Sequence, residues 1–71
     1  MQPAKRSATA YWDFYDASSG KILEKEHAVY KAAMPAQGML VTNITGKPNA
    51  VIRTFKFSRI VNGLPCYDVY V

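Results

Sequence analysis

Apolar and polar residues alternate along much of the chain, and turn-forming residues divide this alternation into short segments. Residues 8–16 (ATAYWDFYD) form an aromatic-rich run that predicts a β-strand. The alternation places Trp12 and Phe14 on one face and Tyr11, Asp13 and Tyr15 on the other. We expect the Trp12 face to be the core, because burying a carboxylate such as Asp13 costs free energy.

Residues 21–34 are the segment whose pattern is ambiguous. Their content of Leu, Glu, Lys, Ala and Met favours a helix, and Ser18 or Ser19 can cap its start. In a helix the apolar residues form one stripe interrupted only by Glu26: Ile22, Leu23, Val29, Tyr30, Ala33 and Met34. The alternative is a β-hairpin, because DASSGK at 16–21 is also good turn chemistry. We predict a helix over 21–33 and keep a strand as the alternative.

The second half of the chain predicts strands joined by short turns. Asn62-Gly63 is the strongest hairpin signal, because both residues tolerate positive φ. Pro65 cannot donate to a strand ladder, so the last strand is expected at a sheet edge or just after this proline. The expected elements are strands at 39–45, 50–61 and 66–71, with a turn at 46–49.

Together these elements predict an α+β fold, a small curled antiparallel sheet with one helix in the order β-α-β-β-β. If 21–33 is a strand instead, the fold becomes an all-β five-stranded sheet or small barrel. With 71 residues the chain has room for one domain, which we place at 8–71, after a polar and flexible arm at 1–7.

Composition narrows the functional classes. The single cysteine, Cys66, allows no internal disulfide, and we expect an inert strand cysteine. His27 has no partners for catalysis or metal binding, and Gly46-Lys47 lacks the phosphate-loop frame. No apolar run is long enough to cross a membrane. We therefore predict a non-enzymatic, cytoplasmic protein with no cofactor, no metal and no membrane association.

Charge suggests a polyanionic partner. Nine Lys and Arg against five Asp and Glu give a net charge of +4, spread along the chain. Around 53–59 two aromatic residues stand between two arginines, a pattern typical of sheets that stack bases and neutralise phosphates. In a regular strand Arg53, Phe55, Phe57 and Arg59 share a face, and Lys56 points the other way. The predicted nucleic-acid-binding residues are Arg53, Lys56, Arg59, Lys47, Phe55 and Phe57. The alternative is that Phe55 and Phe57 are core residues and the two arginines reach solvent at the ends of the strand.

The alternative hypothesis is a protein partner. Tyr11 and Tyr15 are presented on the face opposite the predicted core, and tyrosine is favoured at recognition surfaces. An apolar final strand at a sheet edge can also pair with another strand, including a second copy in a homodimer. Such a chain suits an accessory or inhibitory protein of a phage or other mobile element.

Overall fold

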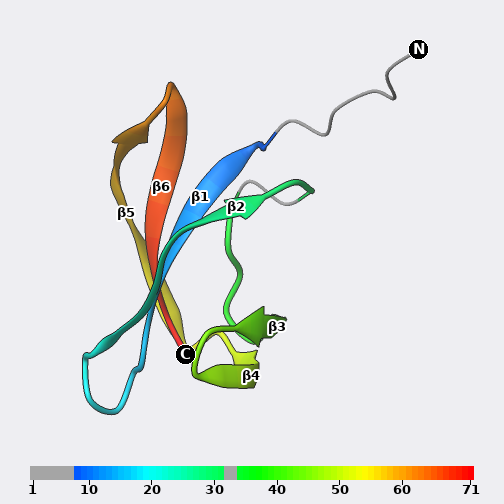
Figure 1. The fold of residues 1–71 in the computed structure, drawn as a ribbon, viewed down its shortest axis with the longest axis vertical. Helices are drawn as coiled ribbons and strands as arrows, with labels where there is room; N and C mark the ends of the chain where they lie inside the picture. The colour runs from blue at the N-terminus through cyan, green and yellow to red at the C-terminus, as the bar shows by residue number, and fades with distance from the viewer. Residues whose placement is uncertain (1–7, 32–33) are drawn as a thin grey trace.

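The computed structural model describes residues 8–31 and 34–71, and within them it contains six strands in two sheets and no helix (Figure 1). The first sheet has the strand order β2-β1-β6-β5, and the second pairs β3 with β4. The strands are β1 (Ala10–Tyr15), β2 (Ile22–Val29), β3 (Leu40–Ile44), β4 (Lys47–Val51), β5 (Thr54–Val61) and β6 (Leu64–Tyr70). The α+β prediction is therefore wrong and the all-β alternative fits, with six strands in two sheets rather than five in one.

The predicted helix is the strand β2, which pairs antiparallel with β1. The turn before it holds the chain in a hairpin: Asp16 accepts hydrogen bonds from the Ser18 N–H (3.2 Å) and the Ser19 hydroxyl (3.1 Å), and Gly20 has φ 77°. Helix propensity amounts to less than about 1 kcal/mol per residue, so ladder pairing and side-chain burial override it here. Residues 32 and 33 of the predicted helix lie outside the described residues.

The β1–β2 ladder is irregular, so the side chains of β2 do not alternate strictly between its two faces. The register shifts on both sides of the Phe14–Glu24 pair, and Glu26 has φ 52°, in the left-handed region. Leu23 and Val29 nevertheless both pack against the core. Through these shifts, Glu24 lies opposite Phe14 and His27 lies opposite Trp12, so two residues three positions apart face the same side of β1, which strict alternation does not allow.

The β5–β6 hairpin follows the sequence prediction. Val61 lies opposite Leu64, and the two residues between them, Asn62 and Gly63, have φ 50° and 78°. The predicted long strand at 50–61, however, is divided. Its first part belongs to β4 in the small sheet and its second part is β5 in the large sheet, with the buried Ile52 between them.

The last strand is not at an edge and begins at Leu64, before the proline, so both alternatives of the prediction are wrong. β6 lies between β1, with which it runs parallel, and β5, with which it runs antiparallel. Pro65 is tolerated because it lies opposite Ile60 of β5, before the point where the β1 ladder begins at Cys66. The homodimer predicted through the C-terminal strand therefore has no free edge to use, since the outer strands of this sheet are β2 and β5.

The β3–β4 hairpin packs on one face of the large sheet and closes the core. Residues from both sheets are buried together: Ala10, Trp12, Phe14, Ile44, Ala50, Ile52, Val69 and Val71. We call this face, which carries Trp12 and Phe14, the packed face. The opposite face carries Tyr11, Asp13 and Tyr15 and is called the tyrosine face.

Two further sequence predictions concern the N-terminal arm and membrane spans. The arm at 1–7 lies outside the described residues. Among residues 8–31 and 34–71 there is no helix that could serve as a membrane span.

Candidate nucleic-acid interface

A bulge in β5 decides which residues share its faces. The β5–β6 register shifts between Phe57 and Arg59, so Phe57 lies opposite Tyr67 while Arg59 lies opposite Cys66. Tyr67 is on the packed face, next to Trp12 in the register, and Cys66 is on the tyrosine face, next to Tyr11. The prediction that Arg59 shares a face with the phenylalanines is therefore wrong, because alternation fails at the bulge.

Arg59 is engaged within the protein. Its guanidinium donates to Oδ2 of Asp13 (2.8 Å) and to Oε2 of Glu26 (3.2 Å), so it spans from β5 across β6 to β1 and β2. Both hydrogen bonds raise the pKa of Arg59, with the bond to Asp13 the larger cause. A phosphate would have to compete with two carboxylates, so Arg59 is a poor phosphate ligand.

Asp13 is fully buried, which the sequence did not predict. Its Oδ1 accepts the Glu26 N–H (2.7 Å), and this bond holds Glu26 in its left-handed conformation. Burial alone would raise the pKa of Asp13, but hydrogen bonds from Arg59, Glu26 and the Cys66 thiol bring it below its ordinary value. The same burial and the nearby Asp13 charge raise the pKa of Cys66, as expected of an unreactive thiol.

We expect the protein to lose stability in acid because of Asp13 and Glu24. Glu24 accepts hydrogen bonds from His27 Nδ1 (2.6 Å) and the Thr45 N–H (3.1 Å), and these bonds lower its pKa. A carboxyl group with a lowered pKa stabilises the folded state above its unfolded-state pKa, and this contribution is lost as the pH falls through the folded-state pKa. Urea midpoints followed by Trp12 fluorescence should be constant from about pH 7 to 5.5 and fall below about pH 4.5. A midpoint unchanged down to about pH 3 would contradict the role of these carboxylates.

Three aromatic rings lie together on the packed face of the outer strand β5 and its neighbour β6. Tyr67 makes edge-to-face contacts with Phe57 (centroids 5.9 Å apart) and with Phe55 (6.5 Å). Phe55 packs against the core, whereas the Phe57 side chain is 55% exposed. We call Phe55, Phe57 and Tyr67 the aromatic row. Tyr67 was missed from the sequence, although its alternation with Val69 in β6 could have placed it on this face.

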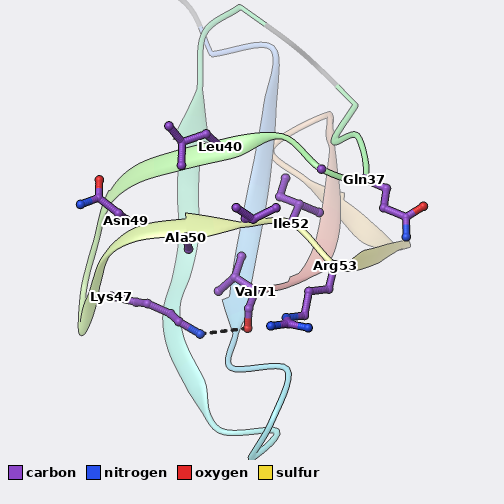
Figure 2. A pocket seen from close by; sticks show the side chains of 10 residues that line it. Gln37, Leu40, Lys47, Asn49, Ala50, Ile52, Arg53 and Val71 are labelled. Atoms are coloured by element: carbon purple, nitrogen blue, oxygen red, sulfur yellow. Dashed lines mark hydrogen bonds between the residues drawn. The ribbon is translucent and has the colours of Figure 1, made fainter.

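A groove containing Lys47 and Arg53 lies between β4 and the end of β6 (Figure 2). It has a volume of about 680 Å³, and its lining has two cationic side chains and no carboxylate side chain. Lys47 Nζ donates to the Val71 carbonyl oxygen (3.2 Å), and Figure 2 shows the Arg53 guanidinium approaching Val71 from the other side. We call this the cationic groove. Its residues are Gln37, Gly38, Leu40, Lys47, Asn49, Ala50, Val51, Ile52, Arg53 and Val71.

Arg53 is the cation best placed for a ligand. Its side chain is exposed, and within the described part of the chain no side-chain hydrogen bond or ion pair engages its guanidinium. Its backbone N–H donates to the Tyr70 carbonyl oxygen (2.8 Å), which fixes the position of the residue against β6. Arg53 stands two residues before Phe55 of the aromatic row.

The structure thus brings together only part of the predicted set. Arg53 and Lys47 share the cationic groove, and Phe55 and Phe57 share the aromatic row. Lys56 is exposed but lies opposite Asp68, on the tyrosine face. Lys56 and Arg59 therefore do not belong to the surface formed by the other four residues.

The tyrosines predicted for protein docking are partly engaged. Tyr15 stacks on Tyr70 with ring centroids 5.1 Å apart, and burial is the main cause that raises its pKa. Tyr11 and Tyr15 are half-buried and share a face, as the alternation predicted. His27 is also half-buried and packs edge-to-face on Phe14.

Among the described residues there is no group of three or more His, Cys, Asp or Glu side chains arranged to hold a metal ion. No protein-family model, curated protein or solved structure matches the chain. The residues and their geometry are therefore the basis for a functional proposal.

Proposed function

We propose that the protein is a non-enzymatic binding protein for single-stranded nucleic acid. The observation that carries the proposal is that Arg53, which lines the cationic groove, stands two residues before Phe55, which belongs to the aromatic row. Bases stack on exposed rings such as Phe57, and Arg53, whose guanidinium no side chain engages among the described residues, supplies charge for phosphates. The net charge of +4 favours the approach of a polyanion.

The form of the surface favours a single strand over a duplex. A stacking surface needs unpaired bases whose faces are accessible, and in a duplex these faces are already stacked on one another. Lys56 and Arg59 are further cations that a duplex could contact. They lie on the tyrosine face, so the sheet separates them from the aromatic row. The protein-docking alternative keeps one supporting observation, the exposed Phe57 and Ile60 (62%) on the outer strand β5.

Binding can be measured by fluorescence anisotropy with a labelled oligothymidine strand and a duplex of equal length. We expect the single strand to bind more tightly, with affinity falling roughly tenfold between about 50 and 200 mM salt, because a few phosphate contacts release counterions. Phe57→Leu should weaken binding about tenfold, since it removes a ring but keeps an apolar side chain.

The matched control is Ile22→Ala, which alters another exposed apolar side chain (46% exposed) on the opposite outer strand β2. It should leave the affinity unchanged, and thermal unfolding should show that both variants remain folded. Absence of binding at about 50 mM salt would refute the proposal, as would Phe57→Leu binding as tightly as the unaltered protein.

A further inference from the structure

The two outer strands of the large sheet, β2 and β5, differ in how regular their edges are. An outer strand presents backbone N–H and C=O groups that could pair with another chain. β2 has two register shifts against β1, and Glu26 within it has a positive φ of 52°, so its edge is distorted. β5 has a single shift, beyond Phe57, and before it residues 54–57 pair one-to-one with residues 67–70 of β6. The more regular edge is therefore that of β5 (Figure 1).

We infer that the outer edge of β5 binds an extended segment of a partner protein in which apolar and acidic residues alternate. The segment adds to the four-stranded sheet as a fifth strand beside β5, which pairs with β6 alone among the described residues. Backbone hydrogen bonds to β5 hold the segment, and the side chains on its two faces determine which sequence is preferred. This interaction goes beyond the proposed nucleic-acid binding and does not depend on it.

Exposed apolar side chains on the packed face of β5 account for the apolar half of this pattern. Phe57 and Ile60 are 55% and 62% exposed. Phe57 lies opposite Tyr67, and Ile60 lies opposite Pro65, two residues earlier in β6, so both side chains are on the packed face. Every second side chain of a strand added beside β5 lies next to them on that face. Apolar residues at these positions remove Phe57 and Ile60 from water.

The charge of β5 accounts for the acidic half of the pattern. Residues 53–61 contain three cations, Arg53, Lys56 and Arg59, and no carboxylate. Arg59 is already paired with two carboxylates. Lys56 is exposed on the tyrosine face, and within residues 8–31 and 34–71 no ion pair engages it, although Asp68 lies opposite it in β6. An acidic side chain on the tyrosine face of the added strand lies beside Lys56 and pairs with it.

A second copy of the chain fits this edge less well than an acidic segment. Two β5 strands side by side bring the Lys56 side chains and their neighbouring cations together, and like charges in adjacent strands are destabilising. The β2 strand of a second copy carries Glu24 and Glu26, but its register shifts interrupt a ladder. Both carboxylates also have partners within the chain, Glu24 with His27 and Glu26 with Arg59. The charge of β5 therefore favours a different protein.

The probe is a labelled peptide of about ten alternating Val and Glu residues, the upper end of ordinary strand length. One control peptide alternates Val with Lys, and the other has the same composition with all Val residues placed before all Glu residues. We expect the alternating Val and Glu peptide to bind about tenfold more tightly than either control in fluorescence anisotropy. In hydrogen exchange followed by NMR, this peptide should slow the exchange of alternate amides in residues 54–57 and leave those of β2 unchanged.

Lys56→Glu should weaken binding of the alternating Val and Glu peptide about fivefold, because an attraction becomes a repulsion. Lys25→Glu makes the same charge change at an exposed residue of β2 and should leave the affinity unchanged. Thermal unfolding checks that both variants are folded.

Equal binding of the three peptides, no binding of any of them, or unchanged exchange of the β5 amides would overturn the inference. So would a dimer in light scattering whose β5 amides are protected without peptide, because a second copy would then occupy the edge. Peptide binding without oligothymidine binding would support this inference and refute the proposed function, so the two proposals fail separately.

Discussion

Replacing Asp13 with asparagine should lower the free energy of unfolding by about 3 kcal/mol, although the side chain keeps nearly the same shape. The neutral amide has no negative charge to pair with the Arg59 guanidinium. Its NH₂ group is a donor, and it would face either the N–H donor of Arg59 or that of Glu26. A buried donor left without an acceptor costs more than the bond itself contributed. The loss would remove much of the stability of so small a domain.

The matched control for Asp13 is Asp68→Asn. Asp68 lies beside Asp13 in the parallel β1–β6 ladder and on the same face, but it is only half-buried. We expect a change of less than about 0.5 kcal/mol for this variant. Urea unfolding followed by Trp12 fluorescence measures both. Equal effects of the two substitutions would show that the buried network does not specifically stabilise the sheet.

Replacing Phe14 with alanine should unfold the protein under native conditions. Phe14 is fully buried, and its ring packs edge-to-face with Trp12 (centroids 6.1 Å apart) and His27 (5.4 Å). Truncating a buried phenylalanine costs about 3–5 kcal/mol through lost burial and the cavity left behind. A 71-residue domain without a disulfide has little stability beyond that amount.

Comparison with other substitutions makes the Phe14 prediction quantitative. Phe57→Ala removes the same ring from a half-exposed position on the same face and should cost about 1 kcal/mol or less. Phe14→Leu keeps most of the volume and should retain a folded protein, with a loss of about 1–2 kcal/mol. Circular dichroism and amide proton dispersion report folding. A folded Phe14→Ala variant as stable as Phe57→Ala would contradict the assignment of the core.

Local signals in the sequence were sufficient for several elements. The aromatic alternation at 8–16 predicted β1 and its two faces, and Asn62-Gly63 predicted the β5–β6 turn. These features depend on side-chain period and on the φ angles that particular residues tolerate, which are properties of neighbouring residues. The same reasoning selected Arg53 and Lys47 as candidate phosphate contacts and Phe55 and Phe57 as candidate stacking residues. It could not predict which of them are close in space.

Contacts between distant segments decided the rest. β2 is a strand because it pairs with β1 and because Asp13 accepts the N–H of Glu26 at the bulge. Neither contact can be predicted from the composition of β2. Arg59 turns to the tyrosine face because of a bulge in β5, and its guanidinium then meets a carboxylate 46 residues away. β6 is an interior strand because it pairs in parallel with β1, a contact between segments far apart in the sequence. By itself the sequence determined the Asn62-Gly63 turn, much of the strand period and the inventory of charges, whereas the turn expected at 46–49 lies at 45–46 because β4 begins at Lys47. Only the tertiary structure decided which faces are buried and which cations remain free, because burial and ion pairing are properties of residues brought together by folding.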